Sequence, residues 1–208
     1  MPSSRGAAEG RLAGVSGAVL AGGSSSRMGR DKAELPIGGV PAAVRIARLL
    51  ASLFGEVLLV GGEPPPDAPG RRVADPPGPR CALRGLTGAL AAADGERVLV
   101  VATDLPLLTP ALLLGLVAWP EADAVVPRTR AGSHPLCALY RSENVLPIAR
   151  ERLAAGDLKL HDLLEQLDCS YLDESELAQL DPEAVALTNV NTPDDLTRAA
   201  SLWAAGRR

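Results

Sequence analysis

The chain has 208 residues and a net charge of -4, with 47% hydrophobic and 22% charged residues. This length suits one domain, because domains usually contain about 50–250 residues, and the composition is that of an ordinary globular protein. The small acidic excess argues against a general nucleic-acid binder, which usually has a basic surplus. It still allows a local basic pocket for a small anion. No apolar run reaches the roughly 20 residues of a membrane-spanning helix, so we expect no membrane partner.

The three cysteines, Cys81, Cys137 and Cys169, stand far apart in the sequence. Their odd number and the lack of a C-x-x-C pair argue against a disulfide framework and a structural zinc site. We therefore expect a reducing compartment, the cytoplasm. Arg5 and Arg11 precede a moderately apolar stretch that loosely imitates a signal peptide. We favour instead a flexible N-terminal segment at residues 1–14 and a domain at residues 15–208, because cleavage would remove the first strand.

In the first half of the chain, predicted strands alternate with predicted helices. Thr109 is placed to cap a helix whose first position is Pro110. Proline-rich segments predict loops, because proline lacks an amide hydrogen and fixes φ. Apolar periodicity predicts strands at 16–21, 56–62 and 97–104, helices at 40–53, 84–93 and 109–119, and loops at 63–70 and 75–79.

The second half continues the alternation. It predicts strands at 123–128, 134–141, 169–173 and 186–190, and helices at 143–156, 159–167 and 192–205. This order indicates an α/β fold, namely a single doubly wound, Rossmann-like three-layer domain with a mostly parallel sheet. In such sheets, ligands bind beyond the carboxyl ends of the strands. That rule selects the loop after Ala21, the loop after Val60, and Asp104.

The loop after the first predicted strand reads GGSSSRMGRDK. Gly22 and Gly23 allow a ligand to approach the backbone closely, and the amides of such a loop can form an anion-binding concavity. Ser24 offers a hydroxyl donor, while Arg27 and Lys32 add positive charge. The loop therefore predicts a polyphosphate site, with a solvated surface turn as the alternative. Neither the P-loop pattern nor the dinucleotide pattern matches, so the phosphate is held in another way.

Two carboxylates and one histidine are further candidates. Asp104 ends the strand at 97–104, where a carboxylate can hold Mg²⁺ together with phosphate oxygens and waters. Asp75 could hydrogen-bond a base or ribose, although a lone aspartate before prolines is often a turn residue. His134 precedes a proline at the start of a predicted strand and could line a pocket. No G-x-S-x-G nucleophile elbow is present, which argues against a serine hydrolase.

Residues 20–32, LAGGSSSRMGRDK, resemble the signature of the molybdenum cofactor guanylyltransferases, which are MobA-type nucleotidyltransferases. Every fixed position of L-A-G-G-x-S-x-R-M-G-x-D-K is filled. Asp104 in VVATDLPLLTP, the segment HPLCALYR and the segment NVNTPDDL resemble the same family in the same order, over roughly residues 15–200. One turn departs from the pattern: the usual G-P-L-A-G reads RGLTG here, with Arg84 in place of the first glycine.

The resemblance implies transfer of GMP from Mg·GTP to the phosphate of molybdenum-molybdopterin, with release of pyrophosphate. It implies that Arg27 and Lys32 stabilise charge on the triphosphate and that Asp104 binds Mg²⁺. Asn189 and Asn191 would line the acceptor side, although Asn191 can equally be read as a turn residue before the last helix. The residues implied to bind substrate are Leu20, Ala21, Gly22, Gly23, Ser24, Lys32, Asp75, Asp104, Asn189 and Asn191.

The base is indicated by Gly22, since a sister family that uses CTP has L-A-A-G at this place. The missing methyl group leaves room for a purine, which favours GTP. The alternatives are a related nucleotidyltransferase that uses CTP or another phosphorylated acceptor, and a nucleotide-binding regulatory module without turnover. The presence of both Lys32 and Asp104 argues against the module. Expected partners are GTP, molybdenum-molybdopterin, and proteins that deliver molybdopterin or mature molybdoenzymes.

Overall fold

The computed structural model describes residues 11–22 and 36–206. Its strands are β1 (Leu12–Leu20), β2 (Pro36–Ile37), β3 (Val40–Pro41), β4 (Phe54–Val60), β5 (Arg71–Val73), β6 (Arg97–Ala102), β7 (Ala124–Thr129), β8 (Gly132–Ser133), β9 (Cys137–Arg141) and β10 (Cys169–Leu172). Its helices are α1 (Ala42–Leu53), α2 (Ala82–Ala92), α3 (Pro110–Ala118), α4 (Ser142–Ala155), α5 (Leu160–Leu164), α6 (Glu174–Leu180) and α7 (Pro193–Gly206).

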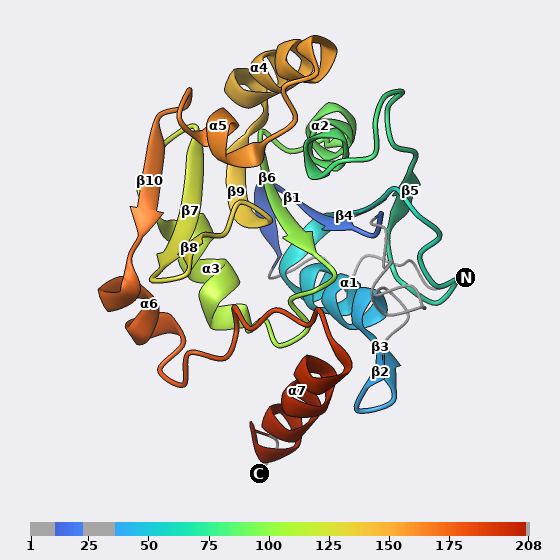
Figure 1. Ribbon diagram of the computed structural model, residues 1–208, viewed down its shortest axis with the longest axis vertical. Coiled ribbons are helices and arrows are strands. Elements are labelled where there is room, and N and C mark those ends of the chain that lie inside the picture. The colour runs from blue at the N-terminus through green and yellow to red at the C-terminus, as the bar shows by residue number, and fades with distance from the viewer. Residues whose placement is uncertain (1–10, 23–35, 207–208) are drawn as a thin grey trace, which may run out of the picture.

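The strands build one large sheet in the order β10-β7-β9-β6-β1-β4-β5, with β8 paired to β7 (Figure 1). β1 lies between β6 and β4 and runs parallel to both. The pairs β4–β5 and β7–β10 are also parallel, whereas β9 runs antiparallel to β6 and β7. The mostly parallel sheet expected from the sequence is therefore confirmed.

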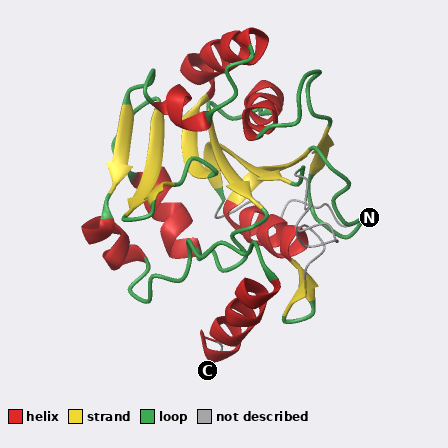
Figure 2. Cartoon of the chain, viewed as in Figure 1, coloured by secondary structure: helices red, strands yellow, loops and turns green. Residues whose placement is uncertain are grey.

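Helices cover both faces of the sheet, as Figure 2 shows. Successive residues of β6 point to opposite faces, so Leu99 and Val101 belong to one core while Val98 and Val100 belong to the other. The first core is closed by α1, α3 and α6, and the second by α2, α4 and α5. Because both faces are buried, the central strands are apolar throughout, and their continuous apolar runs are easy to recognise in the sequence.

Several predicted helix boundaries are confirmed. The Thr109 hydroxyl accepts a hydrogen bond from the amide of Leu112, and Pro110 opens α3. Pro193 opens α7 in the same way. The Asp195 carboxylate accepts hydrogen bonds from the amides of Asn191 and Thr192, and these bonds lower the pKa of Asp195.

Other predictions are corrected by the structure. Residues 186–190, expected to form a strand, are turn and irregular backbone. Their hydrogen bonds go to single loop partners: the Ala186 amide donates to the Asp181 carboxylate, and the Val190 amide donates to the Asp104 carbonyl. Without a ladder of partners, an apolar run does not become a strand. The strand expected at 134–141 begins only at Cys137, and β1 begins at Leu12, before the predicted start at 16.

Four features were not predicted. These are the hairpin of β2 and β3, the edge strand β5, the short strand β8, and helix α6. Ile37 of the hairpin packs with Leu107, Val190 and Ala199, so the C-terminal helix α7 is fastened beside the hairpin. Among the helices that the structure describes, none is long and apolar enough to cross a membrane.

Candidate active site

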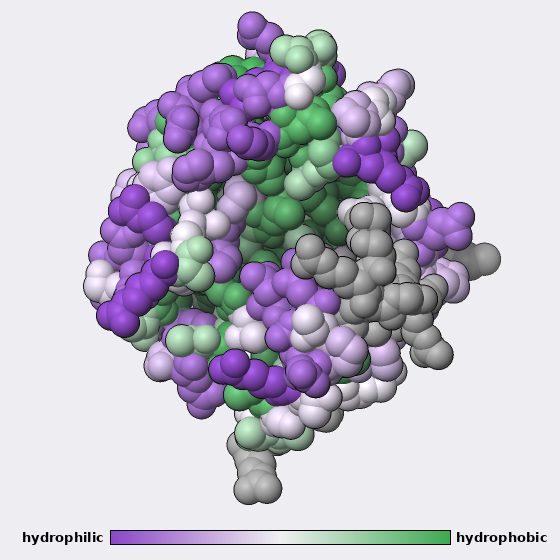
Figure 3. Space-filling model, in the orientation of Figure 1, coloured by the Kyte–Doolittle hydropathy of each residue, from purple (hydrophilic) through white to green (hydrophobic). Residues whose placement is uncertain are grey.

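A cavity of about 470 Å³ opens where β1, β4 and β6 end. The view in Figure 3 shows the molecule hollowed near its centre, with apolar residues visible between hydrophilic rims. Strand ends, loop residues and the start of α2 form the walls. The lining residues are Leu20, Ala21, Gly22, Val60, Gly62, Asp75, Arg80, Cys81, Ala82, Arg84, Gly85, Ala102, Thr103, Asp104 and Leu136.

Five of the residues selected from the sequence meet in this cavity: Leu20, Ala21, Gly22, Asp75 and Asp104. They come from segments as far apart as residues 20 and 104, and the parallel arrangement of β1, β4 and β6 brings them to one edge of the sheet. Four further candidates, Gly23, Ser24, Arg27 and Lys32, lie outside the described residues.

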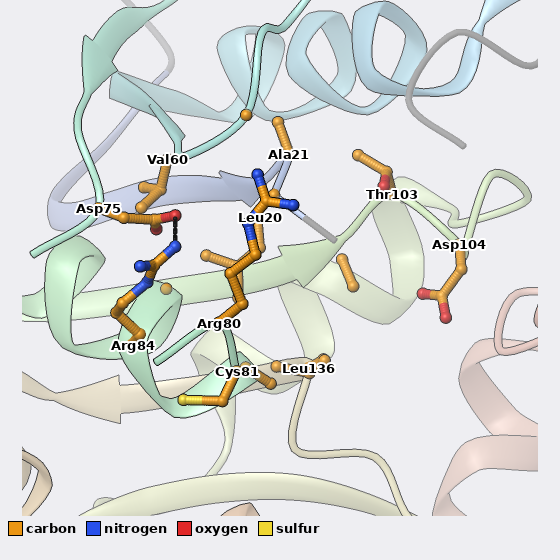
Figure 4. Close-up of a pocket in the computed structure, with 15 residues that line it drawn as sticks. Leu20, Ala21, Val60, Asp75, Arg80, Cys81, Arg84, Thr103, Asp104 and Leu136 are labelled. Atoms are coloured by element: carbon orange, nitrogen blue, oxygen red, sulfur yellow. Dashed lines mark hydrogen bonds and ion pairs between the residues drawn. The ribbon is translucent and has the colours of Figure 1, made fainter. Parts of the chain in front are cut away.

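Asp75 is held on one side of the cavity by an ion pair. Its Oδ2 lies 2.8 Å from Nη2 of Arg84, and both side chains are less than one-fifth exposed. The second terminal nitrogen of Arg84 donates to the carbonyl oxygen of Gly78, also at 2.8 Å. Figure 4 shows the pair on the opposite side of the cavity from Asp104. Arg84 thus provides Asp75 with a fixed cationic partner.

Two glycines that follow β4 allow close approaches, one to this carboxylate and one to the backbone of Ala21. A Cβ on Gly61 would lie 2.6 Å from Oδ2 of Asp75, and one on Gly62 would lie 2.5 Å from the Ala21 carbonyl oxygen. Both residues have positive φ, +67° and +57°, which side chains disfavour. At Gly22, by contrast, a Cβ would make ordinary contacts of 3.4 Å with Oδ2 of Asp75 and the Gly62 amide nitrogen.

Asp104 follows β6 and lies half-buried in the cavity wall, where Figure 4 shows its carboxylate on the far side from Asp75. Within the described parts of the chain, no three His, Cys, Asp or Glu side chains gather as a metal-binding group. A lone carboxylate suits Mg²⁺, which is commonly held by one or two carboxylates together with substrate phosphates and waters. The residues present therefore fit an ion that is held largely by its nucleotide.

A second cavity of about 490 Å³ contains Asn189 and His134 among its lining residues. Burial lowers the pKa of His134, while the negative charge of Asp104 opposes that shift. The imidazole Nε2 lies 3.1 Å from the Thr129 hydroxyl. The expectation that His134 lines a pocket is confirmed. Asn189 and Asn191 are not among the residues that line the first cavity.

Sequence reasoning missed Arg80, which lines the first cavity, and noted Arg84 only as a departure from the family pattern. Arg80 lies in a segment rich in glycine and proline, where a single sequence shows no periodicity. The one available signal was the pair of arginines that flanks the start of α2.

The fold, with its cavity at the strand ends and its two opposed carboxylates, defines a nucleotide-binding α/β domain. The match with a known sequence family is more specific. The chain belongs to the MobA-like NTP transferase domain family, whose profile matches residues 17–170. It is accordingly a nucleotidyltransferase.

Individual relatives extend over nearly the whole chain. A "Probable molybdenum cofactor guanylyltransferase" of Chloroflexus aggregans is 39% identical over 193 residues, covering 88% of this chain and 91% of the relative. The "Molybdenum cofactor guanylyltransferase" of Desulfosudis oleivorans is 29% identical and covers 93% and 98%.

Solved structures support the fold. The molybdopterin-guanine dinucleotide biosynthesis protein A of Archaeoglobus fulgidus aligns with a TM-score of 0.78 at 23% identity, covering 91% of this chain and 99% of the other. The 2-C-methyl-D-erythritol 4-phosphate cytidylyltransferase of Thermus thermophilus aligns with a TM-score of 0.68 at 18% identity, covering 91% and 98%.

We predict that Gly61→Ala weakens nucleotide binding by about tenfold or more, because the methyl group would displace the Asp75 carboxylate. Gly156→Ala is the matched control, since Gly156 has φ +78° and no atom within 4 Å of an added Cβ. Each variant should lose roughly 1–2 kcal/mol of unfolding free energy through backbone strain. Calorimetric titration with Mg·GTP and urea unfolding measure the two effects, and equal binding by both variants would contradict the role of Gly61.

Proposed function

We propose that this protein transfers GMP from Mg·GTP to the phosphate of molybdenum-molybdopterin and releases pyrophosphate. The observation that carries the proposal is the meeting of the first-strand end, Asp75 and Asp104 in one cavity. Relatives named molybdenum cofactor guanylyltransferase, which align over about nine-tenths of the chain, support it. The cytoplasm is the proposed location, and GTP and the pterin are the proposed partners.

In this proposal, the nucleotide lies across the cavity. Asp75, fixed by Arg84, faces the base or ribose, and the backbone of residues 20–22 approaches the phosphates. We propose that Gly23, Ser24, Arg27 and Lys32 also contribute to phosphate binding, with the two cations stabilising charge on the triphosphate. Asp104 would hold Mg²⁺, which neutralises phosphate charge and helps to orient the α-phosphorus when bound. Such a transfer needs positioning more than a protein nucleophile, because the acceptor phosphate attacks.

The acceptor is proposed to occupy the second cavity. Asn189 lines it, and the neighbouring Val190 amide donates a 2.8 Å hydrogen bond to the Asp104 carbonyl oxygen. This bond fixes the acceptor segment, including Asn191, beside the carboxylate proposed to hold the metal ion. Asp104, which lines the first cavity, also interacts electrostatically with His134, which lines the second cavity. Donor and acceptor phosphates would therefore meet near Asp104.

A related nucleotidyltransferase that uses CTP or another phosphorylated acceptor is the second candidate. Its support is the fold likeness to the cytidylyltransferase of Thermus thermophilus. Fold alone does not select a base, because one fold supports several chemistries.

The proposal predicts that GTP stabilises the protein more than CTP, ATP or UTP, each with Mg²⁺. A ligand at a hundred times its Kd adds about 2.7 kcal/mol, which raises Tm by roughly 5–10 °C for a chain of this length. The same samples, supplied with molybdenum-molybdopterin, should release pyrophosphate and form the guanine dinucleotide. Greater stabilisation and turnover with CTP would establish the second candidate, and binding without pyrophosphate release would indicate a regulatory module.

We predict that Asp104→Asn lowers kcat about 100-fold or more, since removal of a charge-stabilising group commonly has this effect. The fold should persist, because the Asp104 backbone still accepts the Val190 hydrogen bond. Asp67→Asn is the control, since Asp67 is exposed and pairs only at the surface with Arg48. Initial rates across a Mg²⁺ titration measure the effect, and turnover near that of the wild type would remove Asp104 from the metal site.

We predict that Gly22→Ala shifts nucleotide preference from GTP toward CTP without unfolding the protein. An added Cβ would make ordinary contacts with Asp75 and Gly62, so the backbone accepts it while the cavity loses space beside Asp75. The ratio of kcat/KM for GTP and CTP measures the preference. Gly55→Ala is the control, because Gly55, like Gly22, lies outside the left-handed region and its added Cβ meets no atom within 4 Å. An unchanged ratio would show that the base is selected elsewhere.

A further inference from the structure

Arg80 is a cationic residue of the first cavity with no role in the transfer proposed above. Its side chain is exposed and lines the cavity. In the view of Figure 4, its guanidinium lies near Leu20 and Ala21, between the Asp75–Arg84 pair and Asp104. Within the described residues, it forms no hydrogen bond or ion pair. An arginine that faces a cavity without a protein partner is available to a ligand.

The loop that carries Arg80 is anchored from α2. Arg84 donates one hydrogen bond to the Gly78 carbonyl and another to the Asp75 carboxylate, each at 2.8 Å. Both anchors lie within the few residues that precede Arg80. Prolines at 76, 77 and 79 further restrict the backbone of this loop. Arg84 therefore fixes the segment from which Arg80 extends.

The charges of the cavity wall show what Arg80 can bind. Among its described lining residues, two are cations, Arg80 and Arg84, and two are anions, Asp75 and Asp104. Arg84 is neutralised by Asp75. A nucleoside triphosphate carries several negative charges, and a divalent ion beside Asp104 offsets only part of them. Arginine offers a planar fork of N–H donors that matches phosphate oxygens in a bidentate manner.

We propose that Arg80 binds the phosphate chain of the nucleotide, and that Arg84 positions the loop that presents it. This inference rests on the proposed nucleotidyl transfer and adds a contact from the α2 side of the cavity. The phosphate chain would thus be held between Arg80 and residues 20–22 at the end of β1. Arg84 acts through Gly78 and Asp75, so it is a positioning residue.

The test uses inorganic tripolyphosphate with Mg²⁺, a probe that has no base and therefore does not depend on the choice of GTP or CTP. Arg80→Ala should weaken binding of tripolyphosphate and of GTP about tenfold or more, while binding of guanosine stays unchanged. Arg80→Lys should recover part of the loss, since lysine restores the charge without the fork. Arg48→Ala, at an exposed pair on α1, is the control. Calorimetric titration measures all affinities.

The positioning role has its own readout. Arg84→Ala should weaken tripolyphosphate binding less than Arg80→Ala, and the double variant should bind no worse than Arg80→Ala alone. Additive losses that persist in an Asp75→Asn background, where no uncompensated carboxylate remains beside the phosphates, would show that Arg84 contacts the phosphates directly and would overturn the positioning role. Urea unfolding of each variant separates these effects from a loss of fold.

The outcomes distinguish this inference from the proposed function. Normal tripolyphosphate binding by Arg80→Ala would overturn the inference, and so would an equal loss of guanosine binding, which would place Arg80 at the base. A wild-type protein that binds tripolyphosphate through Arg80 yet transfers no GMP would contradict only the proposed function. A wild-type protein that binds neither tripolyphosphate nor GTP would contradict both.

Discussion

The position of β1 between two parallel neighbours is the constraint on which the site depends. β4 and β6 flank β1 and end at the same edge of the sheet, while the helices that follow β4 and β6 pack on opposite faces. The connections must therefore part at this edge, and a crevice forms between them. The cavity exists because of this topology, so its walls come from strand ends whose backbone is fixed by ladders on both sides. Side chains at such ends are held more precisely than side chains in a free loop.

Asp104 interacts with residues from several distant segments of the chain. Its side chain lines the first cavity, its backbone oxygen holds Val190, and its charge acts on His134 and Cys137. Burial raises the pKa of Cys137 to about 12, and the nearby carboxylate adds to that shift, so this thiol stays protonated at neutral pH. The Cys137 thiol therefore supplies no thiolate nucleophile beside Asp104. The hydrogen bond to Val190 also connects this centre with the packing of α7 against the hairpin.

The sequence predicts an element well when the signal for that element lies within its own residues, and poorly when the element depends on a partner far away in the chain. β1, β6 and the start of α3 were predicted because buried parallel strands are continuously apolar and because Thr109 and Pro110 form a local capping signal. β5 was missed because a three-residue edge strand depends on its pairing with β4. Residues 186–190 were assigned wrongly because an apolar run says nothing of its hydrogen-bond partners.

The candidate site shows the same division. The end of β1 and Asp104 were singled out because strand-end position is visible in the sequence, and the structure brings them together with Asp75 in the lining of one cavity. The Asp75–Arg84 pair and the position of Arg80 depend on how a glycine- and proline-rich loop folds against α2, which no periodicity reveals. The departure at Arg84 now has a physical reading. A carboxylate that is four-fifths buried needs a partner, and Arg84 supplies one while it leaves Arg80 free of Asp75. Arg84 therefore fixes Asp75 in the cavity wall through this ion pair.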